Sequence, residues 1–150
     1  MAEKANHKSS VEYASHPVAR WALLPIALFT IARSLIHIFA PDGGAQSIAT
    51  IPLDAFTPNG AAAVVHLFAL WGLSQLIIGI IYLAVIWRFP RLLPLMYLLL
   101  ILEYSSRLLL TFIKPFETAG RAPGAIGNYI LLPLSIAIFL LSLKKKRAAL

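Results

Sequence analysis

Six polar side chains within apolar stretches are the residues of this sequence best suited to bind a ligand: Arg33, His37, His66, Gln75, Glu103 and Arg107. A charged group at bilayer depth costs about 2.5–3.5 kcal/mol on insertion scales, so it is paired or functional by default. Arg33 and His37 are four residues apart, as are Glu103 and Arg107, which places each pair on one face of a helix. In the second pair the acid comes first, the favourable order for an ion pair on a helix.

Depth in the membrane brings these residues together. Counted at about 1.5 Å per residue from the expected outer helix ends, Arg33 and Arg107 both lie about 9–10 Å down, the two histidines about 4–6 Å and Glu103 about 15 Å. This predicts an outward-facing polar pocket. One carboxylate cannot neutralise two arginines. We therefore expect Arg33 to have a further hydrogen-bond acceptor. The candidates are a backbone carbonyl, water, Tyr104 and an anionic ligand.

The same residues also have structural interpretations. In this alternative, Glu103 and Arg107 form a salt bridge that only fixes helix packing, and Arg33 extends to the phosphates of outer headgroups. The histidines are then polar residues of the membrane interface. The tryptophans, Trp71 among them, are interpreted as interfacial belt or packing residues.

Small residues on the second apolar segment predict close helix packing. Gly72, Gln75 and Gly79 share one helix face, and glycines at such positions let helices approach closely in lipid. We expect His66 to lie near this face.

The sequence favours binding over catalysis. It contains no G-x-S-x-G, H-E-x-x-H or glycine-rich phosphate-loop motif, and no cysteine. His37 and His66 could instead ligate a haem iron or a metal, or hydrogen-bond a quinone headgroup. A proton path through Glu103 and the histidines is also open.

The composition indicates a membrane protein. Of the 150 residues, 59% are hydrophobic and 13% are charged, and the mean hydropathy is +0.80; typical soluble domains have about 25% charged residues. Four apolar segments, at about 21–40, 61–87, 92–113 and 127–143, have the length of roughly 17–25 residues needed to cross a bilayer. This predicts an all-α, four-helix transmembrane bundle. We expect Pro25 in the first turns of its helix, a bend at Pro133, and a short helix at about 45–51.

Lysine and arginine predict the orientation. Of thirteen such residues, two lie on the outer side (Lys114 and Arg121), two within segments, and the other nine on one side: Lys4, Lys8, Arg20, Arg88, Arg91, Lys144, Lys145, Lys146 and Arg147. By the positive-inside rule, residues 1–20 and 144–150 are cytoplasmic tails. The net charge of +7 is then a topology signal and a contact with anionic headgroups, and not a nucleic-acid surface.

The stretches ARSLIH, HLFALWGLSQLIIGIIYL and PLMYLLLILEYSSRLL carry a family resemblance. Over about residues 21–143 the chain resembles small four-helix bacterial membrane proteins of the DoxX-like kind and related families of unknown function. The resemblance implies a four-helix bundle in the bacterial inner membrane. It implies no activity and no functional residues.

Three functions follow as hypotheses. The first is a small binding or transport module with an outward-facing pocket for an amphipathic or anionic ligand. The second is a haem- or quinone-linked electron-transfer subunit. The third is a non-catalytic accessory or assembly protein, as a homo-oligomer or within a larger membrane complex.

Overall fold

The computed structural model describes residues 16–144, and within this range the protein is all-helical, with four long helices and no strand. The helices are α1 (Pro17–Phe39), α2 (Pro58–Trp87), α3 (Leu93–Ile113) and α4 (Pro123–Ser142). The 3₁₀ turns η1 (Leu53–Ala55) and η2 (Pro90–Leu92) precede α2 and α3. All four helices are long and apolar enough to span a membrane, which supports the predicted fold. Residues 1–15 and 145–150 of the predicted tails lie outside the described residues.

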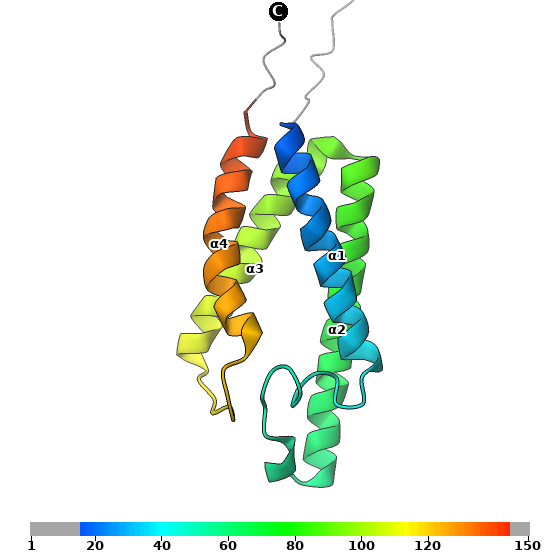
Figure 1. Ribbon diagram of the computed structural model, residues 1–150, viewed down its shortest axis with the longest axis vertical. Coiled ribbons are helices and arrows are strands. Elements are labelled where there is room, and N and C mark those ends of the chain that lie inside the picture. The colour runs from blue at the N-terminus through cyan, green and yellow to red at the C-terminus, as the bar shows by residue number, and fades with distance from the viewer. Residues whose placement is uncertain (1–15, 145–150) are drawn as a thin grey trace, which may run out of the picture.

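The helices form two antiparallel pairs (Figure 1). α1 packs against α2 along its length, and α3 packs against α4. Contacts between the two pairs are sparser. Residues 16 and 144 lie at the same end of the bundle, and the loops 40–57 and 114–122 lie at the other (Figure 1).

Proline and side-chain caps set the helix starts. Pro17, Pro58 and Pro123 each occupy the first helical position, where the missing N–H costs nothing. Nδ1 of His16 accepts from the amide of Val18 at 3.3 Å, and Oγ1 of Thr57 accepts from the amide of Gly60 at 3.2 Å. α1 and α4 each begin four residues before the predicted start, because the polar or small residues there are helical as well.

Two local predictions need correction. Pro25 is the ninth residue of α1 and therefore lies in the third turn, although the helix continues through it. Residues 41–49 form consecutive turns instead of the expected helix at about 45–51. Gly43 and Gly44 have positive φ angles of 59° and 73° just before this range, and Thr50 has a φ of 57° within it, which a regular helix does not allow.

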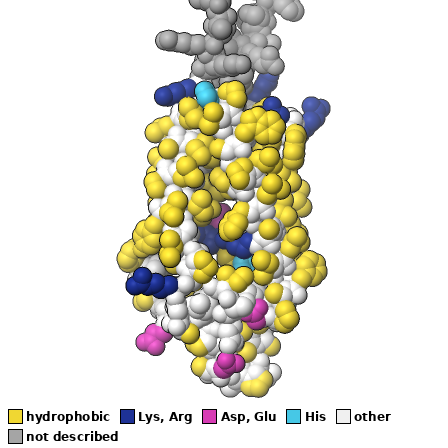
Figure 2. Space-filling model, in the orientation of Figure 1, with side chains coloured by type: hydrophobic (Ala, Val, Ile, Leu, Met, Phe, Trp, Pro, Cys, Tyr) yellow, Lys and Arg dark blue, Asp and Glu magenta, His cyan; other side chains and the backbone are white. Residues whose placement is uncertain are grey.

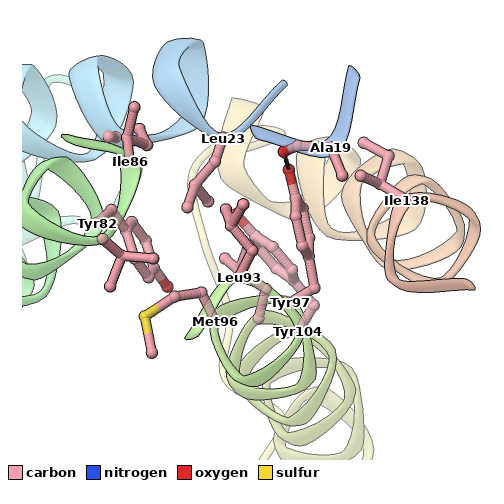
Figure 3. Close-up of a cluster of buried hydrophobic side chains, with 12 residues drawn as sticks. Ala19, Leu23, Tyr82, Ile86, Leu93, Met96, Tyr97, Tyr104 and Ile138 are labelled. Atoms are coloured by element: carbon pink, nitrogen blue, oxygen red, sulfur yellow. Dashed lines mark hydrogen bonds between the residues drawn. The ribbon is translucent and has the colours of Figure 1, made fainter. Parts of the chain in front are cut away.

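The largest buried side chains form one cluster (Figure 3). The cluster lies toward the helix ends that adjoin residues 16 and 144. Tyr82 and Ile86 of α2, Leu23 of α1, and Leu93 and Tyr97 of α3 are almost fully buried there. The Tyr97 hydroxyl donates to the carbonyl of Ala19 at 2.7 Å. This hydrogen bond joins the two helix pairs and satisfies a polar group inside an apolar core.

The outer surface is a hydrophobic belt with charge at its two ends (Figure 2). Arg20, Arg88 and Arg91 lie at the end with the termini, whereas Asp42 and Asp54 lie in the opposite loop. In an opening of the belt, Figure 2 shows basic, acidic and histidine side chains about midway along the molecule. These belong to the polar network described next.

Candidate functional site

Glycines bring α1 and α2 into direct contact beside the site. A Cβ atom on Gly72 would lie 2.7 Å from Cβ of His37, and one on Gly79 would lie 2.7 Å from Cγ1 of Ile31. Real Cβ atoms do not approach so closely. The prediction that these glycines allow close helix packing is confirmed.

A chain of hydrogen bonds connects three helices at this depth. Nη2 of Arg33 (α1) donates to Oε1 of Gln75 (α2) at 3.1 Å, and Nε2 of Gln75 donates to Oε1 of Glu103 (α3) at 3.1 Å. The same Glu103 oxygen forms the salt bridge with Arg107 and accepts from its Nε at 3.1 Å. Gln75 is buried. Its amide oxygen is the hydrogen-bond acceptor of Arg33 that the sequence did not identify.

The Trp71 ring lies next to both arginines. Cζ of Arg33 is 5.0 Å from the centre of this ring and Cζ of Arg107 is 4.9 Å from it. A cation held on an aromatic face gains about 0.5–2 kcal/mol. The sequence alone predicts only belt or packing roles for Trp71. Its spacing of four residues from Gln75 was the signal that placed it on the site's face.

His37 fixes the loop between α1 and α2. Its side chain is buried and its Nδ1 lies 2.6 Å from the carbonyl oxygen of Gly43. Its ring packs against Phe68 and Trp71, with centroids 5.5 and 4.7 Å apart. Nε2 of His37 is buried and has no hydrogen-bond partner. The end of α1, the loop and the tryptophan are thus held as one unit.

His66 does not join this site. It is exposed and lies nine residues before Gln75, about two and a half helical turns, so it is on the opposite side of α2. The expectation that His66 lies near the Gly72–Gln75–Gly79 face is therefore wrong. Buried His37 and exposed His66 do not converge on a shared iron or quinone. Among the described residues no three His, Cys, Asp or Glu side chains group as metal ligands.

The site carries one more positive than negative charge. Arg33 and Arg107 are opposed by Glu103 alone, and Nε of Arg33 is buried without a hydrogen-bond partner. The side chains of Arg107 and Glu103 remain 22% and 24% exposed. A site of this kind favours an anion, because desolvated cations with free donors bind carboxylate or phosphate strongly.

A cavity of about 750 Å³ leads from the loop end of the bundle to this site. Trp71 and Arg107 belong to its wall, as do Lys114 and Arg121 from the loop between α3 and α4. Most of the remaining wall is apolar and includes Leu110, Phe116, Ile126 and Tyr129. Small-molecule sites have this size, about 300–1,000 Å³, and this mixture of apolar walls with a few polar groups.

The fold and the site define the class of the protein: over residues 16–144 it is all-helical, with four potential membrane spans and a polar site between them. Comparison with protein-family models, curated proteins and solved structures found no match. The resemblance to DoxX-like proteins remains a prediction.

Proposed function

We propose that the protein is a small multi-pass membrane protein that binds or transports an amphipathic anion. The anion's charged group lies in the cavity at Arg107 and Trp71, beside Arg33, and its apolar part contacts the apolar cavity wall. The observation that carries this proposal is the cavity wall itself, which places Arg107 and Trp71 next to apolar side chains. The surplus positive charge of the arginine pair is what the anion neutralises.

The proposed setting is the bacterial inner membrane with both termini in the cytoplasm. The basic residues Arg20, Arg88, Arg91 and Lys144 lie at one end of the bundle, which supports a cytoplasmic location for that end. The cavity then opens toward the outside. Lysines and arginines at the cytoplasmic end contact anionic headgroups.

An accessory or assembly role is the second candidate. It is favoured by the hydrogen bonds of Gln75, whose amide pairs with both Arg33 and Glu103. A network that only holds helices together needs no ligand. The two candidates differ in whether an anion binds.

Tryptophan fluorescence distinguishes them. In a variant with Trp21→Phe and Trp87→Phe, Trp71 is the only tryptophan. Titration with dodecanoate in neutral phosphatidylcholine nanodiscs should change its emission saturably, whereas dodecanol should not. Arg33→Leu should weaken dodecanoate binding by about tenfold, and Arg91→Leu, a cation at the other end of the bundle, should leave it unchanged. Equal responses to the acid and the alcohol, together with an unaltered Arg33→Leu variant, would exclude anion binding and favour the accessory role.

A further inference from the structure

The cavity wall carries more positive charge than the single carboxylate of a bound ligand would neutralise. Its charged residues are Arg107, Lys114 and Arg121, and no Asp or Glu belongs to the wall. Glu103 compensates Arg107 from outside the cavity. Lys114 and Arg121 therefore leave about two positive charges for a ligand.

The loop that carries Arg121 is held in place by the other outer loop. The amide of Ala119 donates to the carbonyl of Thr50 at 2.9 Å. The hydroxyls of Thr50 and Thr118 both donate to the carbonyl of Gly120, at 3.0 and 2.8 Å. Thr50 adopts the left-handed backbone conformation, with φ of 57°, which is uncommon for a β-branched residue. The position of Arg121 at the cavity is thus built by contacts between distant segments.

The cations lie at successive depths. Lys114 follows Arg107 by seven residues, about two helical turns toward the loop end. Thr111, between them in sequence, also belongs to the cavity wall. An anionic group that enters from the loop end meets Arg121 and Lys114 first and Arg107 at the inner end. The apolar side chains of Leu110, Ile126 and Tyr129 flank this path.

From this arrangement we infer that the ligand is a phosphate monoester with an apolar tail, its phosphate held by Lys114, Arg121 and Arg107. Such a phosphate carries about −1.5 to −2 charge at neutral pH and three acceptor oxygens, which matches two uncompensated cations and the free donors of a third. A membrane lipid with a terminal phosphate and a water-soluble phosphate share this headgroup chemistry. Because most of the cavity wall is apolar, we expect the site to bind the phosphate with an apolar tail and not the water-soluble phosphate. This inference rests on the proposed function, because it names the class of anion that the same site binds.

The test compares three probes on the single-tryptophan protein in neutral nanodiscs: dodecyl phosphate, dodecanoate and inorganic phosphate. Dodecyl phosphate should bind about tenfold or more tightly than dodecanoate, since it adds charge-assisted hydrogen bonds to the two loop cations. Lys114→Gln/Arg121→Gln should remove this preference and retain dodecanoate binding, which also shows that the variant is folded. Arg88→Gln/Arg91→Gln removes the same charge at the other end and should change neither affinity.

Each contrary result has a distinct meaning. Equal binding of dodecyl phosphate and dodecanoate, or a preference that survives Lys114→Gln/Arg121→Gln, overturns the phosphate inference and leaves anion binding intact. Inorganic phosphate that binds as tightly as dodecyl phosphate overturns the lipid-like form. Failure of both amphiphiles to bind overturns the proposed function itself.

Discussion

The amide nitrogen of Gln75 donates to the carboxylate of Glu103 across 3.1 Å, while the amide oxygen accepts from Arg33. Gln75 therefore joins α1 to α3 through α2. α2 and α3 have few other contacts with each other, so this amide is a principal polar connection between the two helix pairs.

Replacement of Gln75 by Leu should destabilise the protein by about 1–3 kcal/mol, because it removes the acceptor of Arg33 and a donor to Glu103 without replacing either. Thermal unfolding in detergent measures the change. Ser74→Ala is the matched control, since exposed Ser74 donates only to the carbonyl of Leu70 within its own helix. If both variants unfold at the same temperature, Gln75 does not connect the helix pairs energetically.

The Glu103–Arg107 pair predicts an unequal effect of single and double substitutions. Arg107→Leu leaves the carboxylate with Gln75 as its remaining partner and should cost about 1–3 kcal/mol. Glu103→Leu/Arg107→Leu should be more stable than Arg107→Leu, because the carboxylate is no longer left without its ion-pair partner. Thermal unfolding of Glu103→Leu, Arg107→Leu and the double variant under one condition gives the comparison. A double variant at least as unstable as the sum of both single variants would contradict this reasoning.

Gly72 offers a test of the α1–α2 contact. Gly72→Ala places a methyl group 2.7 Å from Cβ of His37 and 3.1 Å from the carbonyl of Ser34. This overpacking should cost about 1–3 kcal/mol. Gly127→Ala in α4 meets no atom within 4 Å and should be neutral or stabilising by up to about 1 kcal/mol. Unfolding temperatures that fall equally in both variants would point to a general effect of substitution.

The sequence was sufficient for the fold and for most of this network. Long apolar segments predicted the four helices, and depth counted along them predicted that Arg33 and Arg107 are level, with Glu103 just below them. The role of Trp71 was not predicted, because belt and site tryptophans look alike in sequence. Only packing shows that both arginines contact this ring.

The hydrogen bonds of Asp42 predict that the loop between α1 and α2 is sensitive to acid. The Asp42 carboxylate accepts from the amides of Ser47, Gly44 and Gln46 at 2.7, 2.9 and 3.1 Å. Chiefly through Ser47, these hydrogen bonds lower the pKa of Asp42 from 3.8 to about 2. A lowered pKa means that the carboxylate's stabilisation is complete above about pH 3.8 and is lost as the pH falls through about 2.

The carboxyl carbon resonance of Asp42 in a pH titration followed by NMR should have its midpoint near pH 2. Asp42→Ala should release the loop already at neutral pH, seen as faster exchange of the Gly44 and Ser47 amides. An Asp42 midpoint near 3.8 would show that the three hydrogen bonds do not persist in solution.

Membrane orientation can be tested without background because the chain has no cysteine. Phe89→Cys lies between α2 and α3 at the basic end, and Glu117→Cys lies in the loop between α3 and α4; both positions are exposed. A membrane-impermeant maleimide should label Glu117→Cys in intact spheroplasts and Phe89→Cys only after lysis. The reverse pattern would invert the proposed topology.

The position of the loop between α1 and α2 illustrates what residue spacing leaves undetermined. A short helix was expected at about 45–51, but the left-handed residues Gly43, Gly44 and Thr50 direct the chain into turns. The loop's contacts with His37 and Gly120 connect residues far apart in sequence, and no local pattern encodes such pairings. His66 was misplaced for a simpler reason. It lies nine residues, or about two and a half helical turns, before Gln75, and therefore on the opposite side of the helix.

The close contact of α1 with α2 also bears on how the chain enters a bilayer. Alone in hydrocarbon, α1 would expose Arg33 at a cost of about 2.5–3.5 kcal/mol. Its partners Trp71 and Gln75 both belong to the next helix. The energetically favourable order of biogenesis is therefore insertion of α1 and α2 together as a hairpin, with the second hairpin supplying Glu103 afterwards.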